Sequence, residues 1–185
     1  MALTVKQLLR RHGAFVSAVT ALLVAVAILL QGIVQAYIGA VSAGQVEGST
    51  FLAALGYGLL QAIPFAVGYF LSLWIVAPIA EELRIGHVIA RAILATGIGV
   101  TVFFIVLAVL AITGAIGING ALFANSLGGF FDLDTAAGGL GKALTSALFA
   151  FASLLPLGVL AGVLLWEWRK DHPPRHPLSG LIDEV

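Results

Sequence analysis

Apolar residues form long uninterrupted stretches of this chain, and the charged residues stand between and beyond them. A helix of about 20 apolar residues, each adding about 1.5 Å, is long enough to cross a bilayer. The sequence therefore predicts an all-α integral membrane protein, built as a bundle of four transmembrane helices. These helices are expected at residues 14–40, 51–79, 91–117 and 143–168. They would form a single domain over 1–168, followed by a tail at 169–185.

The segment between the third and fourth predicted helices is unusual. The third apolar run is too long for one crossing, and we expect it to break at the glycines of "TGAIGING" (113–120). Beyond the break, Asn119 could cap a short helix ending near Leu127, which would lie on the membrane surface or cover the bundle. A candidate outer docking patch follows, with a solvated loop as the alternative. Its residues are Phe130, Phe131, Asp132 and Asp134.

The basic residues are distributed unevenly between the two ends of the predicted helices. Eight of the nine fall on one side of a four-crossing chain, and only Lys142 falls on the other. Cytoplasmic segments are enriched in Lys and Arg, so both termini and the 80–91 loop are expected in the cytoplasm. The Ala- and Gly-rich composition with few lysines suits a bacterium, which makes the plasma membrane (the bacterial inner membrane) the expected location. A cleaved signal peptide is the weaker alternative, because the first apolar run is longer than such peptides need.

Composition supports the membrane assignment and narrows the chemistry. The chain is 61% hydrophobic and 10% charged, whereas a soluble domain carries about 25% charged residues. It has no cysteine, which excludes disulfides and thiolate chemistry, and its net charge is zero, so no nucleic-acid partner is expected. We expect no catalytic, cofactor-binding or metal-binding residues.

Two prolines interrupt the predicted second and fourth helices. Pro64 and Pro156 lie 92 positions apart, and a polar residue stands three positions before each, Gln61 and Ser153. Proline removes a helical hydrogen bond and clashes with the carbonyl four residues earlier, so both helices are expected to kink. The repeated spacing raises the hypothesis of a duplicated helical hairpin. A pair of unrelated kinks is the alternative.

Five polar side chains are candidates for intramembrane contacts: Gln31, Gln35, Gln61, Thr101 and Ser153. Gln31 and Gln35 share one face of a helix because they are four residues apart. Residue counting puts Gln61, Thr101 and Ser153 at similar depth. Such groups either hydrogen-bond across packed helices or line a cavity, and the sequence does not choose between these.

These observations favour a non-catalytic protein that serves as an accessory or scaffold subunit of a larger membrane assembly. An oligomeric channel or transporter for a neutral or lipidic solute is the alternative, because no ionisable group lies deep in a span. A membrane enzyme is the third hypothesis. The expected partners are the lipid bilayer and another membrane protein or a second copy of the chain.

Overall fold

The structure is a computed structural model that describes residues 14–42, 44, 50–80, 82–115 and 136–172. Four long helices and one short π-helix account for most of these residues. Their bounds are α2 (Ala14–Ser42), α3 (Thr50–Leu71), η1 (Ser72–Val76), α4 (Ile85–Ala115) and α6 (Ala136–Asp171). All four long helices are long and apolar enough to cross a membrane, which confirms the expected all-helical architecture. Their insertion into a bilayer stays a prediction.

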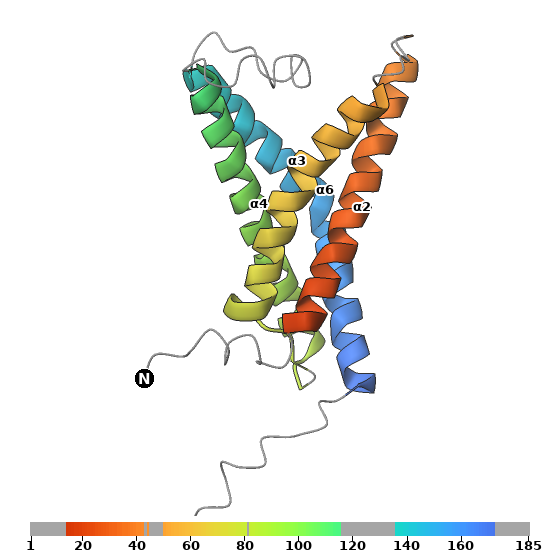
Figure 1. Cartoon of the computed structure of the whole chain (residues 1–185). Coiled ribbons are helices and arrows are strands. Elements are labelled where there is room, and N and C mark those ends of the chain that lie inside the picture. The colour runs from red at the N-terminus through yellow and green to blue at the C-terminus, as the bar shows by residue number, and fades with distance from the viewer. Residues whose placement is uncertain (1–13, 43, 45–49, 81, 116–135, 173–185) are drawn as a thin grey trace, which may run out of the picture.

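The four helices form two hairpins, α2–α3 and α4–α6, which lie close together at one end and spread apart at the other (Figure 1). We call the end at which α2 ends and α6 begins the open end. The opposite end, which holds the connector between η1 and α4, is the closed end. Ala14 and Asp171 both lie at the closed end. Both described ends of the chain are therefore on one side of the bundle.

Two helices begin earlier than expected. α4 begins at Ile85 and not at residue 91, and α6 begins at Ala136 and not at residue 143. The predicted bounds were wrong because they stopped at Arg91 and Lys142, whereas a charged side chain near a helix end can extend to the membrane surface without ending the helix. α4 continues through the first three residues of "TGAIGING" to Ala115. The expected short helix at 119–127 and the docking patch Phe130, Phe131, Asp132 and Asp134 lie outside the described residues.

The sequence explains why α3 ends where it does, at the closed end of the bundle. Pro78 has no N–H, and its ring crowds the carbonyl four residues earlier, which favours the end of the helix before it. The last turn widens into η1, in which the Ala77 amide donates to the Ser72 carbonyl at 2.8 Å, five residues back. Side chains then anchor the connector. Arg91 donates to the Pro78 carbonyl, and Arg169 donates to the Ile79 carbonyl at 2.5 Å.

Glycines set the distance between neighbouring helices inside the chain. A Cβ on Gly68 would lie 2.8 Å from the Gly99 Cα, so α3 and α4 approach almost to backbone contact. A Cβ on Gly158 would collide with the Thr96 hydroxyl, and one on Gly162 would lie 2.6 Å from the Ala92 Cβ. These close contacts allow dispersion forces to hold helices together in lipid.

The contact between α2 and α6 is much weaker than the others. α3 packs extensively on α4, whereas α2 and α6 make few contacts. A duplicated hairpin with twofold symmetry would make these two interfaces equivalent, and they are not. We call the loosely packed side of the bundle the α2–α6 seam.

Large apolar side chains cover the outside of the bundle, as expected for a protein surrounded by lipid. Leu22, Leu23 and Leu30 on α2 are exposed, and so are Leu148 and Leu164 on α6. The interior contains Tyr69, Phe65 and Ile28, each at most 1% exposed.

Candidate functional site

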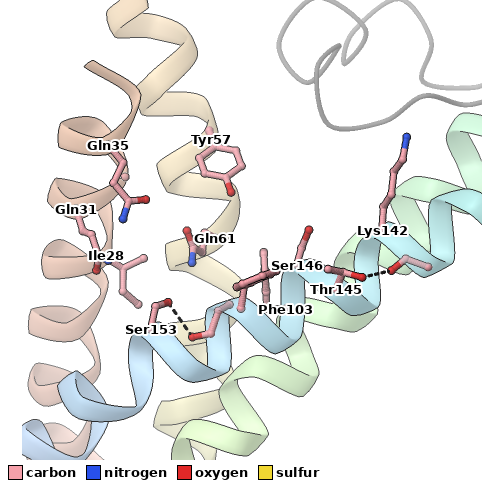
Figure 2. Close-up of a pocket in the computed structure, with 14 residues that line it drawn as sticks. Ile28, Gln31, Gln35, Tyr57, Gln61, Phe103, Lys142, Thr145, Ser146 and Ser153 are labelled. Atoms are coloured by element: carbon pink, nitrogen blue, oxygen red, sulfur yellow. Dashed lines mark hydrogen bonds between the residues drawn. The ribbon is translucent and has the colours of Figure 1, made fainter. Parts of the chain in front are cut away.

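A cavity of about 850 Å³ lies between the two hairpins toward the open end (Figure 2). All four long helices contribute to it, and we call it the polar cavity. Its lining residues from α2 and α3 are Ile28, Gln31, Gly32, Gln35, Tyr57 and Gln61. Those from α4 and α6 are Phe103, Gly141, Lys142, Thr145, Ser146, Phe149, Ala150 and Ser153.

The first hairpin supplies the amide groups. Gln31 and Gln35 follow one another by about one turn on α2, and Tyr57 and Gln61 do the same on α3. Figure 2 shows the Gln35 and Gln61 amides and the Tyr57 hydroxyl directed into the space between the hairpins. A glutamine amide offers two donors and an accepting oxygen, so this side of the cavity can bind both hydrogen-bond donors and hydrogen-bond acceptors of a ligand.

The second hairpin supplies hydroxyl groups from α6. The Thr145 hydroxyl donates to the Gly141 carbonyl at 2.9 Å, and the Ser153 hydroxyl donates to the Ala150 carbonyl at 3.1 Å. These bonds use the hydroxyl hydrogens within the helix and leave the oxygen lone pairs as acceptors. Figure 2 draws no hydrogen bond between the glutamine amides and the α6 hydroxyls. The glutamine amides and the α6 hydroxyls drawn in Figure 2 therefore face a common space without a hydrogen bond between them.

The structure brings together four of the five polar residues that the sequence singled out. Gln31, Gln35, Gln61 and Ser153 line the polar cavity, and Thr101 does not. Thr101 is exposed on α4, and its hydroxyl donates to the Gly97 carbonyl at 2.8 Å. Thr101 therefore lies at a depth similar to that of Gln61 and Ser153 by residue count but does not line the cavity with them. Residue counting gives the depth of a side chain but not the direction in which it points around the helix axis.

Both prolines lie inside continuous helices, close to the cavity. Pro64 is one turn beyond Gln61 in α3, and Pro156 is one turn beyond Ser153 in α6. Figure 1 shows α6 changing direction along its length. Because proline prevents the helix from running straight past the preceding carbonyls, each one favours a bend close to the polar cavity.

The polar cavity carries a single charge among the described residues that line it, that of Lys142. Lys142 is exposed, and Figure 2 shows its ammonium directed away from the glutamines. An ion bound deep in the cavity would lose its hydration and find no charged partner, so the free-energy cost of its desolvation would not be offset. The interior of the cavity therefore suits uncharged polar groups.

A second, apolar space of about 480 Å³ lies in the α2–α6 seam toward the closed end, and we call it the apolar groove. α2 contributes Phe15, Val16, Val19, Thr20, Leu23 and Val24. α6 contributes Leu157, Leu160, Ala161, Leu164, Leu165 and Trp168. The one hydroxyl among them, on Thr20, donates to the Val16 carbonyl of its own helix at 2.8 Å. Apart from the Thr20 oxygen and the Trp168 indole N–H, the groove therefore presents apolar surface to any molecule inside it.

Four polar lining residues were not singled out from the sequence: Tyr57, Lys142, Thr145 and Ser146. The spacing contained a signal for them, because Tyr57 precedes Gln61 by four residues and Ser146 precedes Ser153 by seven, both close to whole helical turns. Of the four, only Lys142 lies outside the predicted helices, because the fourth helix was expected to begin at residue 143.

Within the described residues, no group of three or more His, Asp or Glu side chains is placed to hold a metal ion. Comparison of the chain with models of protein families, with curated proteins and with solved structures finds no match.

Proposed function

We propose that this protein is a membrane channel or transporter that binds a neutral or amphiphilic solute in the polar cavity. The observation that supports this most is the convergence of Gln31, Gln35, Gln61 and Ser153 on one space of about 850 Å³. Polar side chains that only hold a bundle together are expected to hydrogen-bond across packed helices. These side chains instead leave donors and acceptors directed at a volume large enough for a small ligand.

The proposed orientation places the open end outside the cell. Arg84, Arg91, Arg169 and Lys170 belong to the closed end, and Lys142 belongs to the open end. The positive-inside rule then assigns the closed end to the cytoplasm and makes the polar cavity accessible from the outer face. The bacterial inner membrane remains the proposed location.

Cysteine labelling tests the cavity directly, because the chain has no native cysteine. Gln61→Cys and Ser153→Cys should react with an uncharged, hydrophilic maleimide that does not cross membranes, added outside intact cells. Thr101→Cys is the matched control, because Thr101 lies at similar depth but outside the cavity, and it should not react. Failure of both cavity cysteines to react from either face would contradict a solute-accessible cavity and, with it, the proposed function.

Flux measurements test transport itself. Vesicles containing the protein should swell faster than empty vesicles in gradients of glycerol or urea, the two neutral probes. The double variant Gln61→Ala/Ser153→Ala should reduce that difference, and Thr101→Ala should not. Equal rates in protein-containing and empty vesicles would contradict transport of small neutral solutes.

An accessory or scaffold role is the second candidate, supported by the exposure of α2. Of the four candidate spans, α2 has the smallest buried share, 22% of its most apolar stretch. Such a surface could contact another membrane protein as well as lipid. Gentle extraction followed by identification of co-purifying proteins tests this role, and recovery of the chain alone would contradict it.

A further inference from the structure

We propose that the solute is an amphiphile taken from the bilayer, with its uncharged polar group in the polar cavity and its hydrocarbon chain in the apolar groove. This inference rests on the proposed function, because it assigns a chemical class to the ligand of the same cavity. Three features support the inference. The polar cavity and the apolar groove are adjacent along the same helices, and one is polar where the other is apolar. The α2–α6 seam is also open to the surrounding lipid.

The two spaces follow each other along the α2–α6 seam. On α2 the groove ends at Val24 and the polar cavity begins at Ile28. On α6 the polar cavity ends at Ser153 and the groove begins at Leu157. Each step is about one helical turn. A molecule lying along the seam would therefore pass from one space into the other.

The chemistry changes sharply at this step. The polar cavity offers the amides of Gln31, Gln35 and Gln61 and the hydroxyls of α6, whereas the groove offers mainly hydrocarbon and aromatic surface. A small polar solute would gain nothing from the groove, and a simple hydrocarbon would leave the glutamine amides without partners, which is costly away from water. A molecule with a hydroxyl- or amide-bearing head and an apolar tail uses both spaces.

The groove also has a suitable length. From Phe15 to Val24 it follows α2 for about 14 Å at 1.5 Å per residue, close to half of a hydrocarbon core of about 30 Å. That is the depth of one leaflet, so the groove accommodates a chain about as long as those of membrane lipids. Phe15 is 79% exposed and Trp168 is 46% exposed, which leaves the edges of the groove open to lipid.

The weak packing of α2 on α6 gives the amphiphile a route of entry. On the opposite side of the bundle, the close approach of Gly68 to Gly99 seals α3 against α4. Among the described glycines, none makes such a close approach between α2 and α6, which make few contacts with each other. A lipid-like molecule could therefore enter sideways from the bilayer without crossing water.

Photo-crosslinking tests this assignment. The probe is a monoacylglycerol analogue with a diazirine in its acyl chain, added to phosphatidylcholine vesicles that contain the full-length protein. Crosslinks should concentrate on groove residues such as Leu23 and Leu160, compared with lipid-facing Ile105 on α4. Excess unlabelled monoacylglycerol should suppress them.

Leu160→Trp should fill the groove and reduce this crosslinking roughly tenfold, equivalent to about 1.4 kcal/mol of binding free energy. Ile105→Trp is the matched control, because Ile105 is 53% exposed and Leu160 is 55% exposed, but Ile105 lies outside the groove. It should leave crosslinking unchanged. Thermal unfolding of both variants in detergent verifies that each is folded.

Two outcomes would overturn the inference: crosslinks spread evenly over all exposed helix faces, or equal crosslinking of Leu160→Trp and Ile105→Trp. If the cavity cysteines still react with maleimide and the vesicles still pass glycerol, the proposed function stands without a lipid-like ligand. If the cysteines do not react either, the proposed function fails as well.

Discussion

The Tyr69 hydroxyl donates a hydrogen bond of 2.7 Å to the Gly158 carbonyl, which joins the two helices that contain prolines. Tyr69 is fully buried, and its ring stacks on Phe65 with ring centroids 5.8 Å apart. Gly158 also packs against Thr96 of α4. Three helices therefore meet at one point on the closed-end side of the polar cavity, and this contact limits how far the hairpins can separate there.

Replacing Tyr69 with Phe should lower the free energy of unfolding by about 1 kcal/mol. The substitution keeps the ring but removes the donor, and intramolecular hydrogen bonds contribute about 0.5–1.5 kcal/mol in water and about 0.6 kcal/mol on average inside membrane proteins. Unfolding in mixed micelles of increasing SDS content measures the change. Tyr37→Phe is the control, because Tyr37 is exposed on α2, and it should have almost no effect. Equal effects of the two variants would contradict a stabilising role for the Tyr69 bond.

Gly158→Ala should destabilise the bundle by about 1–3 kcal/mol. The added methyl group would collide with the Thr96 hydroxyl and push α6 away from α4, which is the cost of overpacking a close interface. Gly56→Ala provides the comparison within the same protein, because a Cβ there meets nothing within 4 Å. Alanine favours the helix by up to about 1 kcal/mol over glycine, so Gly56→Ala should be neutral or stabilising. The unfolding assay used for Tyr69→Phe measures both.

The four long helices could be predicted from the sequence because the chain is expected to lie in lipid. A backbone in hydrocarbon must satisfy its own hydrogen bonds, so a long charge-free run is expected to be helical. The helix ends are harder to predict, because Arg91 and Lys142 end the charge-free runs of the sequence but lie within helices in the structure. Nothing in a charge-free run marks where a helix continues past the hydrocarbon into the interface.

The cavity could be predicted only in part. Gln31 and Gln35 share a face by spacing alone, and Gln61 and Ser153 were linked through the prolines that follow them. Thr101 was grouped with them by depth, but its direction depends on how α4 packs against its neighbours. That packing depends on Gly68–Gly99 and Gly158–Thr96, which are contacts between residues far apart in the chain. The apolar groove had no signature, because its leucines resemble those that face lipid.

Arg169→Gln should loosen the connector at the closed end. Arg169 donates to the Ile79 carbonyl, and Ile79 is fully buried, so losing this bond should allow the connector to open more often. Trypsin cleavage after exposed Arg84, followed by mass spectrometry of the fragment, should become faster than in the unmodified protein. Lys170→Gln is the control, because it removes an exposed ion pair with Glu167, at 3.5 Å, and exposed pairs contribute little. Cleavage after Arg84 at the same rate in both variants would contradict the anchoring role of Arg169.

Ile28→Ala should widen the passage between the polar cavity and the apolar groove. Ile28 is 1% exposed and lines the polar cavity. It lies one turn from Val24, the residue of α2 at which the groove meets the cavity, so its side chain is at the boundary between the two spaces. Truncating it should widen this boundary and increase glycerol flux into vesicles, if the seam is the path that solutes follow. It should also lower stability by about 2–5 kcal/mol, as the loss of a buried aliphatic side chain does.

Leu107→Ala separates these two effects. Leu107 is a buried aliphatic residue of α4 that lines neither the polar cavity nor the apolar groove, so its truncation should cost comparable stability without changing the boundary. Glycerol flux should then rise for Ile28→Ala alone, while thermal unfolding shifts in both variants. A rise of the same size in both would mean that loosened packing admits the solute, and the seam would no longer be the path.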